Sequence, residues 1–301
     1  MKYFSVPGYF EFFNQIRLVT EYRELHPDYF YSDRIIDSSY DFLPGLIWNG
    51  GRIQPFHTFD ERKLIAVQSY YHDSPIKMRH VCTNQLLTPE LLLDWQSNLW
   101  LQVNEKEGNG VIVASDLLEE YVKEKYPKYE IITSTTCGIT DPDKANELSA
   151  QHLFVVNYNM NNNNAYLSLL KHPENCEILC AEPCPANCAN RANHYADISR
   201  KHLWIDLDIP EPCPNRDRMP YNFYDVQRMP NAVTNERVDE LAKMGFQYFK
   251  ISGRQSPIHN WYEMIIYYLI LPEYRDRVRQ DLLNIEYNVL LLQDTNWVPF
   301  T

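Results

Sequence analysis

The sequence has no apolar run that is long enough to cross a lipid bilayer, although 45% of its 301 residues are hydrophobic. A membrane-spanning helix needs about 20 consecutive apolar residues. The N-terminal segment, Met1-Lys-Tyr-Phe-Ser-Val-Pro-Gly8, also lacks the apolar stretch of a secretory signal. We therefore expect no membrane association and a cytoplasmic location.

Positive charge is scarce: 28 Lys and Arg residues stand against 40 Asp and Glu residues, and the formal net charge at pH 7 is −12. Proteins grip nucleic acid in general through Lys and Arg side chains that neutralise phosphates. We expect no such grip here, although the composition leaves room for a local basic pocket. The expected partners are a small molecule, a single nucleobase or another protein.

Several motifs of common folds and activities are also missing. The sequence has no glycine-rich dinucleotide fingerprint and no repeat of fixed period. Neither a Ser-His-Asp arrangement nor a His-Glu-x-x-His motif is visible. These absences argue against a dinucleotide-binding sheet and against peptidase activity.

Short apolar or β-branched runs alternate with amphipathic segments along most of the chain. Helix-start signals occur at Thr88, Asp116, Asp141 and Thr234. The runs that we expect to form buried parallel strands are Lys77–Cys82, Gly110–Ser115, Glu130–Ser134, His152–Tyr158, Glu177–Ala181 and Phe246–Ser252. This order predicts an α/β fold, a TIM-like (β/α)8 barrel, with an incomplete or distorted barrel as the alternative.

The expected organisation is a single barrel domain over residues 1–301. Residues 1–50 are aromatic and turn-rich, and we predict that they wrap one face of the barrel. The barrel core is expected at 75–255. Residues 256–301 have a helical pattern rich in tyrosine and leucine, and we expect them to form a C-terminal extension against the barrel exterior.

Polar residues close several predicted strands, which is where TIM barrels carry their functional groups. Lys250, which faces the interior if Phe249 faces the helices, and Arg254 are predicted catalytic residues near an anionic group of the substrate. A buried lysine needs a partner or a shifted pKa, and a structural ion pair is the alternative role for Arg254. Asn84 and Asn157 are predicted substrate-binding residues, with turn and cap roles as the alternative.

Arg191 and His194 lie where a helix is expected to follow the cysteine-rich loop. We predict that they help to bind an anionic substrate or to orient a metal cluster. A solvated helix face is the alternative interpretation.

The seven cysteines are clustered, which in a reducing compartment favours metal or redox chemistry over disulfides. Four of them recur every four residues from Cys176 to Cys188, but Pro183 and Pro185 exclude the helix that would bring them onto one face. Cys184 and Cys188 follow a strand end. Together with Cys213, in a proline-flanked loop, they are the predicted metal ligands.

The fourth ligand position is open. Cys137 is the first choice because it follows a strand end, and Cys180 and Cys82 are the alternatives. An iron–sulfur cluster is favoured over zinc, since zinc prefers two close cysteine pairs. The remaining alternative is that these thiols are small buried hydrophobic groups without a metal.

The motif Phe249-Lys-Ile-Ser-Gly-Arg254 is similar to the Phe-Lys-Ile-Glu-Gly-Arg signature of the collagenase-like peptidase U32 family. The strand and cysteine loop at 177–188, and the segments 82–88 and 187–195, resemble a divergent branch of the same family. The resemblance implies a TIM-like barrel with a four-iron cluster on cysteines. In better understood members it also implies oxygen-independent hydroxylation of a ubiquinone precursor or an RNA base, with prephenate as oxygen donor.

The chain departs from the family pattern at two points. Ser252 replaces the glutamate of the signature, and the four-cysteine pattern maps only onto Cys184, Cys188 and Cys213. Either a cysteine from another strand end completes the set, or the cluster keeps an open iron.

The leading hypothesis is an iron–sulfur-dependent oxidoreductase or hydroxylase for a nucleobase or other small aromatic substrate. The alternative is a non-catalytic binding barrel with structural zinc or reduced thiols.

Overall fold

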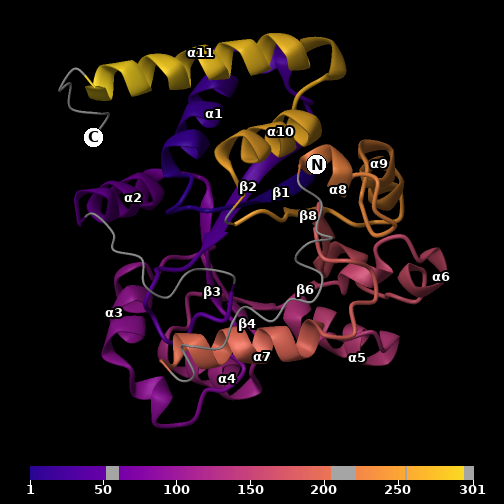
Figure 1. The fold of residues 1–301 in the computed structure, drawn as a ribbon. Helices are drawn as coiled ribbons and strands as arrows, with labels where there is room; N and C mark the ends of the chain where they lie inside the picture. Colours follow the sequence, from indigo (N-terminus) through magenta and orange to yellow (C-terminus); the bar gives the residue numbers. More distant parts are fainter. Residues whose placement is uncertain (52–60, 205–221, 255, 295–301) are drawn as a thin grey trace.

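The protein forms a closed barrel of eight parallel strands in a computed structural model, which describes residues 1–51, 61–204, 222–254 and 256–294 (Figure 1). Neighbouring strands follow chain order, and β8 returns to pair with β1. The strands are β1 (Lys2–Pro7), β2 (Arg34–Asp41), β3 (Lys77–Cys82), β4 (Gly110–Val113), β5 (Glu130–Thr133), β6 (Leu153–Val155), β7 (Cys176–Cys180) and β8 (Tyr248–Ile251). The predicted TIM-like barrel is confirmed, and its ring of strands is complete.

Helices connect successive strands and surround the barrel (Figure 1). They are α1 (Phe13–Leu25), α2 (Glu61–Asp73), α3 (Trp95–Val103), α4 (Asp116–Lys125), α5 (Pro142–Ser149), α6 (Asn164–Leu167), α7 (Arg191–His202), α8 (Phe223–Val226), α9 (Asn235–Lys243), α10 (Ile258–Leu269) and α11 (Arg275–Asp294). Within the described residues, no helix combines the length and the apolar character needed to cross a bilayer.

The helix-start signals were correct at three of four positions. α4 begins at Asp116, and the side chains of Asp141 and Thr234 cap α5 and α9 by accepting backbone N–H groups. The segment after Thr88 instead forms a short 3-10 turn, Leu91–Leu93, and α3 begins after Asp94, which accepts a hydrogen bond from the Ser97 amide.

The prediction that residues 1–50 wrap the barrel is wrong, because this segment supplies β1, α1 and β2. The two strands bury small polar side chains, among them Ser5, Ser38 and Ser39, which are at most 1% exposed. Parallel strands usually read as continuous apolar runs, so these polar residues concealed the strands. Residues 256–294 are helical, as expected, and place α10 and α11 beside α1 (Figure 1).

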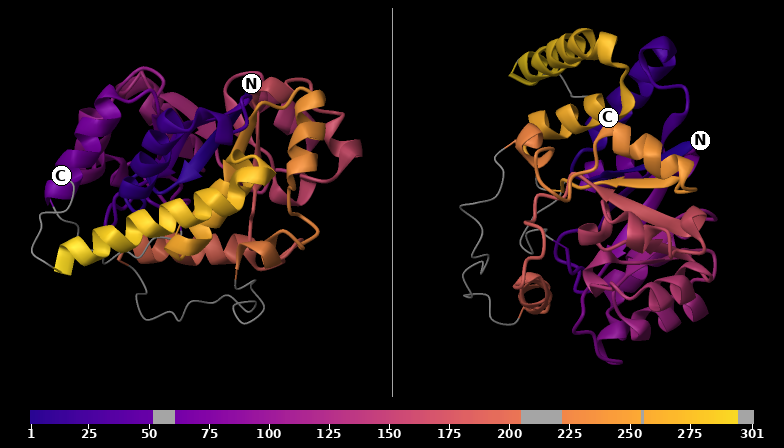
Figure 2. Two further views of the ribbon diagram at one scale, coloured as in Figure 1. Left: turned by 90° about the horizontal axis from the view of Figure 1, so that it is seen from above. Right: turned by 90° about the vertical axis from the view of Figure 1, so that its right-hand side faces the viewer.

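An additional helix, α7, lies between β7 and α9 and is placed at one open end of the barrel (Figure 2). Ser199 of α7 accepts hydrogen bonds from Asn84 and Gln85, which follow β3, and His202 bonds the Gly51 carbonyl. Asn84 and Gln85 follow the C-terminal end of β3, and Gly51 lies in the segment after β2. α7 therefore lies over the barrel mouth, where TIM barrels carry their active sites.

The barrel interior holds an ion chain of five side chains from four strands. Lys77 and Arg79 of β3 lie 3.4 and 3.5 Å from the carboxylate of Asp37 in β2. Arg79 also makes a short ion pair with Glu177 of β7, and Glu177 lies 3.8 Å from Lys250 of β8. TIM-barrel interiors are usually filled by branched apolar side chains, so a buried ion chain is a departure that needs a reason.

Gly110 of β4 lies beside this chain. A Cβ atom there would lie 2.8 Å from Ile132 Cδ1, 3.2 Å from the Glu130 carbonyl oxygen and 3.6 Å from Arg79 Cγ, the last an ordinary contact distance. A larger residue at this position would therefore require the end of the Ile132 side chain to shift.

Candidate functional site

The mouth of the barrel gathers charged and aromatic side chains from three strand ends. β8 contributes Lys250, the segment after it contributes Arg254, and β2 contributes Tyr40 and Asp41. Glu182, which follows β7, lies close enough to Tyr40 to contribute to the raised pKa of that phenol, after burial and alongside other charges. The site is built from segments far apart in sequence.

Lys250 faces the barrel interior, because Phe249 is fully buried among the apolar side chains outside the sheet. Its Nζ lies 3.9 Å from the centroid of the Tyr40 ring and 3.8 Å from Glu177 Oε2, and neither contact is a hydrogen bond. Burial, together with the charges of Arg79 and Arg254 and against the opposing effect of Glu177, lowers the pKa of Lys250 to about 7. At neutral pH the amine is thus present in both protonation states.

Arg254 shares the Tyr40 ring with Lys250, with its guanidinium carbon 5.6 Å from the ring centroid. Its Nη1 lies 4.0 Å from Asp41 Oδ1 and has no hydrogen-bond partner among the described residues. Gly51 touches the guanidinium closely, since a Cβ at that position would lie 2.0 Å from Nη2. Arg254 is therefore fixed in place while keeping a donor unused.

Asp41 is held by the backbone. Its carboxylate accepts hydrogen bonds from the amides of Phe10, Glu11 and Phe42. Burial nevertheless raises the pKa of Asp41, against the opposing charge of Arg254. The carboxylate orients Arg254 from a distance rather than pairing with it in hydrogen-bond contact.

Arg191, the first residue of α7, provides a third cation at the mouth. Its guanidinium lies 4.1 Å from the Tyr158 ring centroid and 5.2 Å from that of Tyr195, and Nη1 is 3.5 Å from Glu182 Oε1. None of its three side-chain nitrogens has a hydrogen-bond partner among the described residues, although the side chain is only 12% exposed. Buried donors are normally satisfied, so these nitrogens are available to a ligand.

Cys184 and Cys188 lie together after β7. Cys184 is 4% exposed and packs with Tyr158 and Leu179, and Cys188 packs against the same small cluster. The predicted third ligand, Cys213, lies outside the described residues.

The expected fourth ligands are not brought to this pair. Among the described residues, no three His, Cys, Asp or Glu side chains are grouped closely enough to hold a metal ion. Cys82 and Cys180 are fully buried in the apolar core, and burial raises the pKa of both thiols. Burial also raises the pKa of Cys137 to about 11. The described residues thus supply two thiols of a cluster site and do not by themselves complete one.

The predicted substrate-binding asparagines are occupied by backbone groups. The Asn84 side chain donates to the carbonyls of Ile47 and Ser199 and accepts from the Leu86 amide, and it is fully buried. Asn157 caps the short 3-10 helix that follows β6 by accepting from the Asn159 amide. Both contacts are the turn and cap roles given as the alternative. His194 is partly exposed on α7, where it stacks on Tyr195.

Sequence reasoning missed Tyr40, Asp41, Glu177 and Glu182 as site residues. Tyr40 and Asp41 were hidden because β2 was not recognised. Glu177 carried a usable signal, since it is an acidic residue inside a predicted buried strand and a buried lysine needs a partner.

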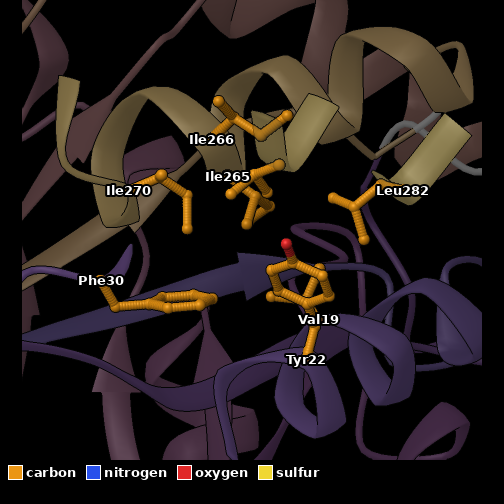
Figure 3. Close-up of a pocket in the computed structure, with 8 residues that line it drawn as sticks. Val19, Tyr22, Phe30, Ile265, Ile266, Ile270 and Leu282 are labelled. Carbon is orange, nitrogen blue, oxygen red and sulfur yellow. The ribbon is translucent and has the colours of Figure 1, made fainter. Parts of the chain in front are cut away.

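A pocket away from the mouth is lined by apolar residues of α1, α10 and α11 (Figure 3). Figure 3 shows the side chains of Val19, Tyr22 and Ile265 converging on it. Its interior has no room for a water molecule, so it is a packing gap rather than a substrate site.

No family model and no curated protein matches the sequence. The structure is similar to that of the U32 peptidase Mk0906, with a TM-score of 0.50 and 15% sequence identity over 74% of this chain and 87% of that one. This likeness agrees with the family resemblance predicted from the sequence, and at this identity it concerns the fold. The chain therefore has the TIM-like barrel of a U32 peptidase structure.

Proposed function

We propose that the protein is an enzyme that acts on a small anionic substrate at the C-terminal mouth of the barrel. One observation carries the proposal: the buried guanidinium groups of Arg254 and Arg191 keep donors that no described residue satisfies, and Lys250 Nζ lies 3.8 Å from Glu177 Oε2, beyond hydrogen-bond distance. Cationic donors of this kind bind carboxylates and phosphates through charge-assisted hydrogen bonds. An anion placed among them would satisfy these donors.

The three cations have separate roles in this proposal. Arg254 and Arg191 bind the anionic part of the substrate. Lys250, whose pKa is near neutrality, takes or gives a proton at the reacting atom. Lys250 and Arg254 share the Tyr40 ring, with Nζ and the guanidinium carbon 3.9 and 5.6 Å from its centroid.

Thermal unfolding with inorganic phosphate, pyruvate, succinate or benzoate tests the anion site. A ligand at 100 times its Kd raises the free energy of unfolding by about 2.7 kcal/mol. We expect at least one of these anions to raise the Tm of the wild type, and Arg254→Gln and Arg191→Gln to reduce that rise. Arg228→Gln is the matched control, because Arg228 is 79% exposed and its ion pair among the described residues is with nearby Asp225. If both mouth variants respond like the control, the proposal is wrong.

We also propose a second candidate, an iron–sulfur-dependent oxidoreductase or hydroxylase for a nucleobase or other small aromatic substrate. The juxtaposition of Cys184 and Cys188 at the mouth favours it. Since the described residues offer no third ligand, a cluster would require Cys213 and would retain an iron without a cysteine ligand. Such a cluster would supply electron transfer for oxygen-independent oxidation. The likeness to a U32 peptidase structure concerns the fold alone and does not carry proteolysis over to this chain.

Anaerobic purification followed by metal analysis and ultraviolet–visible spectroscopy tests the cluster. We expect iron and sulfide that are lost in Cys188→Ser and retained in Cys137→Ser, because Cys137 is not grouped with the pair. Stoichiometric zinc would instead support the alternative of a non-catalytic binding barrel. A metal-free protein would identify these thiols as small buried hydrophobic groups.

A further inference from the structure

Lys250 has the surroundings of a nucleophilic amine as well as those of a proton carrier. Its Nζ is enclosed by the Tyr40 ring and by a carboxylate that already pairs with Arg79. Lysine becomes a nucleophile for carbonyl groups when an apolar environment or a neighbouring cation favours the neutral amine. Both conditions are met at this position.

We propose that Lys250 forms an imine with the substrate, which is a carbonyl compound that also carries an anionic group, such as a 2-oxo acid or a phosphorylated aldehyde. The inference rests on the proposed anion site and specifies the class of substrate.

Three charged groups and one aromatic ring surround Lys250, and they come from four different parts of the barrel. Glu177 of β7 lies 3.8 Å from Nζ, and Arg79 of β3 pairs with the same carboxylate. Arg254 lies after β8, and Tyr40 of β2 presents its ring face. Two cations and burial oppose one carboxylate, and the pKa of Lys250 is lowered to about 7 as a result. A substantial fraction of the amine is therefore unprotonated at neutral pH.

The reaction balances without an oxidant or a reductant. The Nζ lone pair attacks the carbonyl carbon, and the carbonyl oxygen takes up a proton to give a carbinolamine. Loss of water then leaves the carbon–nitrogen double bond, so amine and carbonyl compound give imine and water. Glu177 Oε2, which has no hydrogen-bond partner among the described residues, is placed to accept the proton that leaves Nζ.

The anionic group is assigned to Arg254. The guanidinium carbon and Lys250 Nζ lie 5.6 and 3.9 Å from the centroid of one ring, that of Tyr40. In this assignment the carbonyl carbon of the substrate meets Nζ while its carboxylate or phosphate meets Arg254 Nη1, which has no hydrogen-bond partner among the described residues. Bidentate recognition of such groups is the usual role of arginine.

Pyridoxal 5′-phosphate is a suitable probe, because it is an aldehyde with a phosphate, and borohydride converts its imine into a stable amine. We expect peptide mass spectrometry to find Lys250 as the main reduced adduct at pH 7. Lys106 is the internal control, since its Nζ donates to the carbonyls of Tyr71, His72 and Ser74 and should remain unlabelled.

Pyridoxal without phosphate separates the imine from the anion site. We expect at least tenfold faster labelling of Lys250 by the phosphate form, and we expect Arg254→Gln to abolish this advantage while Lys106→Arg preserves it. The labelled lysine is identified in the wild-type protein. The test therefore does not depend on whether a Lys250→Met variant folds.

Each outcome is decisive. Absence of a borohydride-dependent adduct at Lys250 with both aldehydes overturns the imine, even if phosphate still raises the Tm through Arg254. Equal labelling by both aldehydes supports the imine and overturns the anion site. Labelling spread over surface lysines in place of Lys250 also overturns the imine.

Discussion

The ion pair between Arg79 and Glu177 in the barrel interior leads to a prediction about stability. The two side chains are 2% and 0% exposed, so water cannot replace either partner. Glu177→Gln removes the charge that balances both Arg79 and Lys250. Removing one partner of a buried pair costs about 3 to 5 kcal/mol, because the other charge stays buried and uncompensated.

Two features of the structure place the expected loss near the lower end of that range. Asp37 lies 3.5 Å from Arg79 Nη2 and compensates part of its charge. Lys250 can release its proton, because its pKa is already lowered to about 7 by burial and by neighbouring cations. We therefore expect Glu177→Gln to lower the free energy of unfolding by about 3 kcal/mol at pH 8.

Urea unfolding followed by circular dichroism measures this loss. Glu147→Gln is the matched control, because Glu147 and its partner Lys144 are 58% and 48% exposed, and a surface pair contributes at most about 1 kcal/mol. The double variant Arg79→Met with Glu177→Gln should recover part of the stability, since it removes the unpaired cation. A loss below about 1 kcal/mol, or a double variant no more stable than the single one, would refute the reasoning.

Three further predictions concern the mouth and the thiols. Because the pKa of Lys250 is lowered from 10.5 to about 7, the unfolded chain binds the extra proton between these values. Stability should rise with pH across this window by up to about 1.4 kcal/mol per unit, and urea unfolding of Lys250→Met should lack that slope. Gly51→Ala should weaken anion binding as Arg254→Gln does, since its Cβ meets the guanidinium. Gly138→Ala, with φ of 69° and no atom within 4 Å, should cost about 1–2 kcal/mol of stability and leave binding unchanged in the same titration. The Cys180 thiol, fully buried and with a raised pKa, should react with Ellman's reagent only after unfolding.

Much of the barrel could be predicted because its last six strands obey a simple pattern. The six runs from Lys77 to Ile251 are short and separated by helix-start signals, most of them are apolar or β-branched, and each forms a strand near its predicted position. β1 and β2 were missed since Ser5, Ser38 and Asp41 interrupt the pattern. These residues belong to the polar interior and the mouth, where function departs from the usual packing rules.

Only the part of the site that lies on a single strand, β8, could be predicted from the sequence. Alternation along β8 placed Lys250 inside and Phe249 outside, and both positions are confirmed. Tyr40 and Glu182 come from other elements, and their approach to Lys250 and Arg254 depends on closure of the whole barrel. Among the described residues, Cys137 does not form a metal-binding group with Cys184 and Cys188. The spacing of the cysteines could not show this, because sequence distance does not determine distance across a barrel mouth.

The ion chain of the barrel interior alternates in sign from its lower end to the mouth. Lys77, Asp37, Arg79, Glu177 and Lys250 follow one another as plus, minus, plus, minus and plus. The series ends on a cation when Lys250 is protonated and sums to zero when it is not. The neutral amine that attacks a carbonyl group is therefore also the state in which the five side chains carry no net charge. The chain keeps the barrel interior electrically balanced in the protonation state in which Lys250 reacts.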